Sequence, residues 1–329
     1  MPDANRRQPE SASRHQTNQI KSTAHRSMTH MLNAQQTARR LPWLALVDEV
    51  ANLLNDDSVQ VPQRIVQALG GGSSLFVMPA LDTQIAITKL ITYTPLNAQS
   101  SRPVIQGDIV VFNVATGQRV LVLDGPTVTA RRTAAVSVLA AQRLAHDPQG
   151  QLLIVGAGVQ GKAHLEAFAE VLGTRKIMIA SRSLLSAQLL AQHGTALGLQ
   201  AQAVGDANQA LGSCSVVITC TPASSIVLHA MPKHSTFISA VGAFTPTMAE
   251  LSPELCQLVA DRGTVWIDAA SARHEAGDLL QAGLNLKAIP TLGDVVRQNM
   301  PKPAGPVLFK SCGWAGWDLA AARVAVRQG

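Results

Sequence analysis

Three glycines, Gly156, Gly158 and Gly161, have the spacing G-x-G-x-x-G in the stretch LLIVGAGVQGKAHLEAF. In such a turn the first glycine allows a tight bend, the second lets a pyrophosphate approach the main chain, and the third lets a helix pack closely on the preceding strand. The N–H groups that begin the helix then face the phosphates. An apolar run precedes the turn and a helical pattern follows it, so we predict a dinucleotide site that includes Val159 and Gln160.

The next apolar run, in RKIMIASRSL, ends in Ser181, Arg182 and Ser183. An acidic side chain at this place would accept hydrogen bonds from the ribose 2′-hydroxyl of NAD. Two hydroxyls and a guanidinium favour a 2′-phosphate instead. We therefore predict NADPH as the cofactor, with NADH as a weaker substitute. The alternative is that Arg182 is a solvated surface residue and that the cofactor is held elsewhere.

Four other cations raise similar questions. Arg131 and Arg132 fall in the first turn of a helix predicted over about residues 128–145, where the helix dipole disfavours a cation by about 0.3–1 kcal/mol. Either an anion docks there, or the arginines pair with Asp124 or solvent. Lys89 lies inside the apolar strand TQIAITKLITY, so it either reaches solvent at an edge or points into a site. Arg64 alone would be taken as a surface residue.

Two patterns of elements surround these residues. Residues 41–54 are spaced as an amphipathic helix, and residues 74–81, 83–95 and 107–125 alternate as strands, with a hairpin turn at 115–117. The first region is therefore predicted to be mostly antiparallel sheet. From residue 151 the pattern becomes strand, helix, strand, which indicates a doubly wound parallel sheet and an α/β fold.

Composition excludes several classes of protein. The net charge of +6 arises almost entirely in residues 1–40, which carry seven Arg or Lys and two Asp or Glu. Only 3% of residues are aromatic, so we expect no nucleic-acid binding. Four cysteines without metal-ligand or disulfide spacing predict a reducing compartment and no metal site. No apolar run is long enough for a membrane span or a secretory signal, so we expect a cytoplasmic protein whose residues 1–35 form a disordered basic tail.

These motifs, with TKLITYTPLN, GQRVLVLDGPTVTARRTAA, AVGAFTPTMAEL, VWIDAASARHEAGDL and LFKSCGWAGWDLAAA, resemble the ornithine cyclodeaminase/mu-crystallin family over about residues 41–325. The chain looks most like the bacterial Δ1-pyrroline-2-carboxylate reductases of that family. The resemblance implies a Rossmann domain (146–302) inserted into a discontinuous α+β substrate and dimerisation domain (36–145 with 303–329). It also implies a homodimer.

Site residues follow from the same resemblance. Arg64, Lys89 and Arg132 match positions that hold the substrate carboxylate or a neighbouring cofactor phosphate, and Lys89 is the expected catalytic residue. Thr221, Val241 and Gly242 match positions beside the dinucleotide. Two carboxylates that the family's cyclodeaminases use are replaced by Phe76 and Phe244, which we expect to line an apolar pocket.

The reaction expected on this basis is NADPH-dependent reduction of Δ1-pyrroline-2-carboxylate to L-proline, and of the six-membered Δ1-piperideine-2-carboxylate to L-pipecolate. A small cyclic imino acid is therefore the expected partner. Ornithine cyclodeaminase and a mu-crystallin-like NADPH-dependent binding protein remain alternatives. Other polar residues are expected to have structural roles: Asp268, Glu275 and Asp278 as caps, His164 on a solvated helix face, Asp318 in interdomain packing, and Lys310 and Ser311 near the site.

Overall fold

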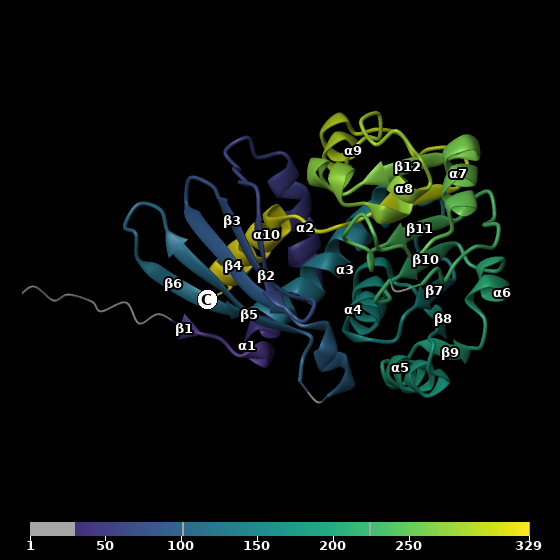
Figure 1. Cartoon of the computed structure of the whole chain (residues 1–329), viewed down its shortest axis with the longest axis horizontal. Coiled ribbons are helices and arrows are strands. Elements are labelled where there is room, and N and C mark those ends of the chain that lie inside the picture. The colour runs from purple at the N-terminus through teal and green to yellow at the C-terminus, as the bar shows by residue number, and fades with distance from the viewer. Residues whose placement is uncertain (1–29, 101, 224, 329) are drawn as a thin grey trace, which may run out of the picture.

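The computed structural model describes residues 30–328 except Ser101 and Ser224. Two lobes lie side by side, each built on one sheet (Figure 1). We call residues 30–145 together with the helix at 315–327 the antiparallel lobe, and residues 146–310 the parallel lobe. The predicted α/β class with a Rossmann-type sheet is confirmed.

The sheet of the antiparallel lobe has six strands in the order β1-β6-β5-β4-β3-β2. Only the short β1 pairs in parallel with its neighbour, and the other strands run antiparallel. The predicted hairpin turn lies between β5 and β6, whereas β2 was not predicted. The strands are β1 (His30–Met31), β2 (Ile65–Gly70), β3 (Ser73–Leu81), β4 (Ile85–Tyr93), β5 (Ile105–Asn113) and β6 (Arg119–Asp124).

One face of this sheet is covered by α3 and α10, α2 packs against these two helices, and α1 packs beside β6. The long helix α3 is rich in alanine and is buried on nearly all sides, because it also packs against α4 and β11 of the parallel lobe. It therefore joins the two lobes. The bounds are α1 (Ala34–Arg39), α2 (Trp43–Leu54), η1 (Pro95–Gln99), α3 (Gly125–Leu144) and α10 (Ala315–Arg327).

All seven strands of the other sheet are parallel, in the order β12-β13-β11-β10-β7-β8-β9. The order reverses between β7 and β10, so a ligand crevice is expected at the carboxyl ends of these two strands. The strands are β7 (Leu152–Val155), β8 (Lys176–Ala180), β9 (Gln200–Val204), β10 (Val216–Thr219), β11 (Phe237–Ala240), β12 (Thr264–Ile267) and β13 (Val307–Lys310).

Helices flank this parallel sheet, and a single π turn continues α4. They are α4 (Val159–Ala167), η2 (Phe168–Leu172), α5 (Leu184–Ala196), α6 (Ala207–Leu211), α7 (Pro253–Arg262), η3 (Ala270–His274), α8 (Gly277–Gln281) and α9 (Leu292–Gln298). None of the helices in the described ranges is both long and apolar enough to cross a bilayer.

Two boundaries predicted from the sequence need correction. Strand β13 pairs between β11 and β12, so the return of the chain to the antiparallel lobe begins after Lys310 rather than at residue 303. The predicted tail (1–35) lies outside the described residues up to position 29. Residues 30–35 are ordered, because β1 pairs with β6 and Asn33 caps α1 in a capping box with Gln36.

Candidate active site

Lys89 lies near the middle of β4 with its side chain on the helix-covered face of the sheet. Its exposed fraction is 1%, and its Nζ donates to Asp318 Oδ1 of α10 over 3.1 Å. The lysine therefore points into the interior, which resolves the question that the sequence left open. Burial lowers the pKa of Lys89 to about 8, with the Asp318 carboxylate raising it and nearby Arg132 lowering it.

Arg132 shares the same carboxylate. Its Nε donates to Asp318 Oδ1 over 3.3 Å, and its guanidinium lies against Gly313, which has a positive φ of 87°. Three elements, β4, α3 and α10, thus bring two cations to one buried oxygen. The second oxygen, Asp318 Oδ2, is buried without a hydrogen-bond partner in the part of the chain that the structure describes. We call Lys89, Arg132 and Asp318 the buried triad.

Asp318 was expected to serve interdomain packing, and the structure corrects this. Its side chain is fully buried and contacts both predicted site cations. No local pattern signals this role, since Asp318 lies 229 residues from Lys89 along the chain. The only hint is a lone carboxylate within the apolar helix AGWDLAAARVAV, where an unpaired charge would be costly.

Arg131 has a structural role that is separate from the buried triad. Its guanidinium stacks on Trp43, 3.7 Å from the ring centre, and Nε donates to the carbonyl of Leu41 over 2.8 Å. The proposed pairing with Asp124 is not formed, because Asp124 caps α3 by accepting from the main-chain N–H of Thr127. Since α3 begins at Gly125, neither arginine lies in its first turn, and the helix-dipole argument was wrong.

Arg64 precedes β2 and reaches across to the parallel lobe. Its Nη2 lies 2.6 Å from Glu275 Oε1, just after η3, and its guanidinium is 5.8 Å from the centre of the Phe76 ring. Glu275 was expected only as part of a cap. It instead forms an ion pair between the lobes that holds a predicted substrate-binding arginine.

The two predicted pocket phenylalanines are both partly buried. Phe76 lies opposite Ile91 on the face of the sheet that also carries Lys89. Phe244, from the loop after β11, makes an edge contact with Tyr93 at the end of β4, with ring centres 5.8 Å apart. The two rings therefore belong to the region where the lobes meet, and their role as a substrate pocket stays a prediction.

The glycine turn after β7 has the shape that a pyrophosphate requires. A side chain at Gly161 would place its Cβ 2.0 Å from the carbonyl oxygen of Gly156, and Gly156 has a φ of 120°. At Gly158 a Cβ would meet nothing within 4 Å, so the turn is open there. Helix α4 begins at Val159 without a side-chain cap, which leaves its first N–H groups available for an anion. These residues fit a dinucleotide.

At the end of β8 the Arg182 side chain is exposed, and Ser181 is half-buried. The Ser183 hydroxyl caps α5 by accepting from the Ser186 N–H over 3.2 Å. No hydrogen bond or ion pair of Arg182 is found among the described residues, so the guanidinium is free to meet a phosphate or solvent. The choice between these two interpretations stays open.

Thr221 and Gly242 are held together by a carboxylate that the sequence did not indicate. Glu250 accepts from the N–H and hydroxyl of Thr221 and from the N–H of Gly242. Val241 immediately precedes Gly242, and its N–H donates to the carbonyl of Thr219. These predicted cofactor-binding positions thus lie at the carboxyl ends of β10 and β11, next to the open glycine turn after β7.

Several other expectations are corrected or refined. His164 is fully buried rather than solvated: it bonds to the Ser137 hydroxyl and the Gln160 carbonyl, and burial lowers its pKa to about 4. Among the described residues, no hydrogen bond or ion pair joins Lys310 or Ser311 to the buried triad. Lys310 pairs with Asp278 over 2.8 Å, and Ser311 donates to Asp268. No group of side chains suited to a metal ion is found in the described ranges.

A Rossmann-type sheet with an open glycine turn, next to a second lobe that buries a triad of charges, defines a two-lobed dinucleotide-binding fold. The model of the ornithine cyclodeaminase/mu-crystallin family matches residues 28–328. The chain belongs to this family.

Named relatives and a solved structure agree with that assignment. The chain is 34% identical to Delta(1)-pyrroline-2-carboxylate reductase 1 of Burkholderia multivorans, covering 91% of this chain and 96% of the relative. It is 33% identical to the Delta(1)-pyrroline-2-carboxylate/Delta(1)-piperideine-2-carboxylate reductase of Azospirillum brasilense, covering 90% and 94%. The Thermococcus litoralis reductase, solved with NADH and L-proline, superposes with a TM-score of 0.83 at 22% identity, covering 91% and 96%.

Proposed function

We propose that the protein reduces Δ1-pyrroline-2-carboxylate to L-proline, and Δ1-piperideine-2-carboxylate to L-pipecolate, with NADPH. The observation that carries this proposal is the charge balance where the lobes meet. Three cations, Lys89, Arg132 and Arg64, face two carboxylates, Asp318 and Glu275. Within these ion pairs one positive charge is left over, which suits a substrate with one carboxylate. The nearby buried carboxylate of Asp268 is held by hydrogen bonds from Ser311, Gly313 and Trp317 instead.

The chemistry needs a hydride at the imine carbon and a proton at the imine nitrogen. The glycine turn after β7 would hold the pyrophosphate of NADPH and Arg182 its 2′-phosphate, and the reduced nicotinamide supplies the hydride when the cofactor is bound. Lys89 supplies the positive charge that orients the carboxylate, and its ammonium group is the candidate donor of the proton, since its pKa of about 8 is close to that of a working acid. Asp318 keeps the ammonium in place through its hydrogen bond.

Phe76 and Phe244 favour this reaction over ornithine cyclisation. Ring closure with loss of ammonia requires groups that move several protons, and phenylalanine cannot do so. Apolar rings instead suit the methylene groups of a small cyclic substrate. A difference of one methylene changes such contacts by about 1–3 kcal/mol, so we expect both ring sizes to be accepted.

The direct test is NADPH oxidation followed by absorbance, with the two cyclic imino acids side by side. We expect stoichiometric oxidation of NADPH with both compounds. Binding of the imines without turnover would favour a ligand-binding protein. Release of ammonia from ornithine would favour the cyclodeaminase.

Asp318 provides a further test, because its negative charge raises the pKa of Lys89. Lys89 must be protonated to act, so kcat/KM should fall as the pH rises through about 8. In Asp318→Asn this fall should move to lower pH, and kcat/KM at pH 8 should drop at least about tenfold, since a hydrogen bond to a charged group contributes about 1.5–3 kcal/mol. The measurement is the pH profile of kcat/KM.

Glu49→Gln is the matched control for Asp318→Asn. Glu49 is also a buried carboxylate paired with arginines, but its partners Arg323 and Arg327 lie outside the buried triad. This variant should lose stability and keep the wild-type profile. An Asp318→Asn profile with an unmoved alkaline limb would show that Lys89 is not the titrating group.

We also propose that two chains associate. The face of the antiparallel sheet that the helices leave uncovered carries exposed Ile65, Leu90 and Phe112. Such an apolar face favours association with another protein surface. A single-chain mass in light scattering would contradict this. The cytoplasmic location is retained as part of the proposal, on the basis of the four cysteines that lack disulfide or metal spacing.

A further inference from the structure

Glu250 is a fully buried carboxylate that the proposed reaction does not use. It accepts four hydrogen bonds from the two strands beside it. Oε1 accepts from the N–H and the hydroxyl of Thr221 over 2.7 and 2.9 Å, and Oε2 accepts from the Gly242 N–H over 2.7 Å and the Thr219 hydroxyl over 3.0 Å. The side chain thus ties the carboxyl end of β10 to that of β11.

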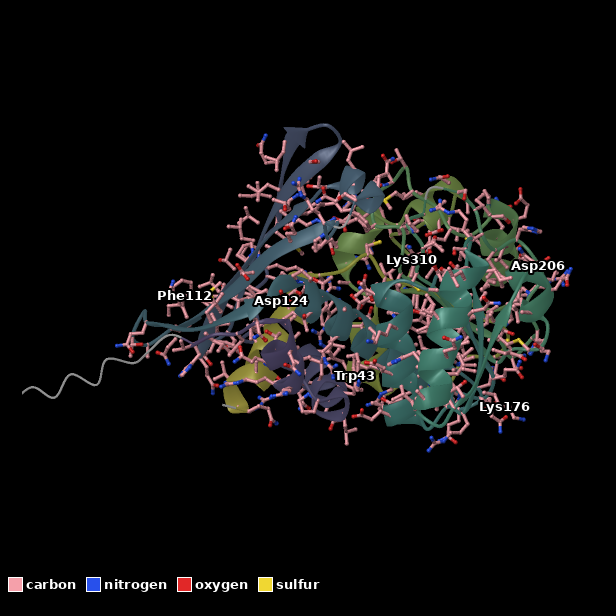
Figure 2. The ribbon with its side chains drawn as sticks, turned by 90° about the horizontal axis from the view of Figure 1, so that it is seen from below. Trp43, Phe112, Asp124, Lys176, Asp206 and Lys310 are labelled. Carbon is pink, nitrogen blue, oxygen red and sulfur yellow. The ribbon has the colours of Figure 1, made fainter. Side chains whose placement is uncertain are left out.

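The contact between Glu250 and the two strand ends leaves no space for a side chain at position 242. A Cβ at Gly242 would lie 2.2 Å from the Thr221 carbonyl oxygen and 2.4 Å from Glu250 Oε1. The main chain of Glu250 is fixed as well, because its N–H donates to Asp278 Oδ1 over 2.6 Å. Asp278 in turn pairs with Lys310, which lies inside the parallel lobe (Figure 2). Glu250, Asp278 and Lys310 form what we call the strand-end cluster.

With both carboxylates ionised, the strand-end cluster has one net negative charge, since its single lysine neutralises only one of them. No cation in the described ranges lies within ion-pair distance of Glu250 itself. Burial raises the pKa of Glu250, with Lys310 and the Thr221 hydrogen bonds opposing this effect. Each oxygen of Glu250 accepts one main-chain N–H, from Thr221 and from Gly242. These two hydrogen bonds favour the ionised carboxylate, in which both oxygens are acceptors.

The position of this charge matters if a dinucleotide binds, which is the part of the proposed function on which the inference rests. The glycine turn after β7 is suited to the pyrophosphate, and Arg182 after β8 to the adenosine half. The nicotinamide half then extends in the opposite direction, over the ends of β10 and β11. Glu250 holds these two strand ends through its hydrogen bonds to Thr221 and Gly242.

We propose that Glu250 is a positioning residue that shapes the nicotinamide side of the crevice and, through its charge, favours the oxidised cofactor over the reduced one. The oxidised ring carries a positive charge that the reduced ring lacks, so a buried anion beneath it stabilises the oxidised form selectively. In the direction of imine reduction the oxidised cofactor is the product. The anion therefore favours transfer of the hydride out of the cofactor.

The test is to measure the dissociation constants of NADP+ and NADPH by calorimetry for wild type and Glu250→Gln, with thermal unfolding of each apo protein. We expect the ratio Kd(NADP+)/Kd(NADPH) to rise roughly three- to thirty-fold in the variant, as for one charge acting at an effective dielectric constant of about 20. Thr219→Val is the control: it removes one hydrogen bond and keeps the charge, so its ratio should equal that of wild type.

Equal weakening of both cofactor forms in Glu250→Gln would reduce Glu250 to a structural residue and overturn the proposal. If Glu250→Gln does not fold, the ratio is measured for the wild type at decreasing pH instead: protonation of Glu250 removes the negative charge and should raise the ratio. A ratio that stays constant down to the pH of unfolding would overturn the proposal. Failure of the wild type to bind either form would instead contradict the proposed function.

Discussion

Lys89→Met should lower kcat/KM for the cyclic imines by about 10²–10⁴-fold, the usual contribution of a positioned acid. The affinity for NADPH should stay within about threefold of wild type, because the partners of Lys89 are Asp318 and the proposed substrate carboxylate rather than the glycine turn. Methionine keeps the length and much of the volume of the buried side chain, so the loss reports on charge and proton rather than on a cavity. Steady-state kinetics and fluorescence titration with NADPH measure the two quantities.

Stability has to be followed in the same variant. Removing one partner from a buried ion pair costs about 3–5 kcal/mol when the other charge is left alone, but Arg132 still donates to Asp318 here. We therefore expect Lys89→Met to fold with a moderately lower Tm. An equal loss of NADPH affinity and activity would show that Lys89 binds the cofactor phosphate rather than the substrate carboxylate.

Arg182→Ala should raise the dissociation constant of NADPH by about 10- to 100-fold. A charge-assisted contact to the 2′-phosphate contributes about 1.5–3 kcal/mol, which corresponds to this change. NADH lacks the phosphate, so its binding should be almost unaffected. Ser181→Asp combined with Arg182→Ala should go further, because the new carboxylate repels the phosphate and accepts from a free 2′-hydroxyl. The measurement is the NADPH-to-NADH ratio of kcat/KM.

Lys176→Ala is the matched control for Arg182→Ala. Lys176 is an exposed cation at the opposite end of the same strand, β8, and lies at the periphery of the parallel lobe (Figure 2). Its loss should leave the cofactor preference unchanged. A wild type that prefers NADH, or a ratio indifferent to Arg182, would return Arg182 to the class of solvated surface residues.

The elements of the fold with strong local signals were predictable. The turn of Gly156, Gly158 and Gly161 is specified by neighbours within a few residues, and so is the hairpin between β5 and β6. By contrast, β2 is an exposed edge strand and β9 an edge strand of the parallel sheet, so neither has the continuous apolar run of a central strand.

The site was predictable only in part, since its partners meet through the fold. Lys89 could be selected as a cation inside an apolar strand and Arg132 through the family resemblance, but the carboxylate between them comes from α10, far along the chain. His164 was assigned to the wrong face because the helical pattern of α4 cannot show that Ser137 of α3 lies opposite it. Glu250 and Glu275 looked ordinary, since their importance comes from groups that only the folded chain brings within reach.

Strand β13 has a consequence for how the protein is made. It is synthesised after every other strand of the described chain, yet it lies between β11 and β12. On a ribosome, where residues emerge in order, β11 would present an unpaired edge, and β12 would have no neighbouring strand until β13 arrived. Asp318 emerges later still. The chain must therefore remain open at this edge during translation, exposed to mispairing with other nascent chains.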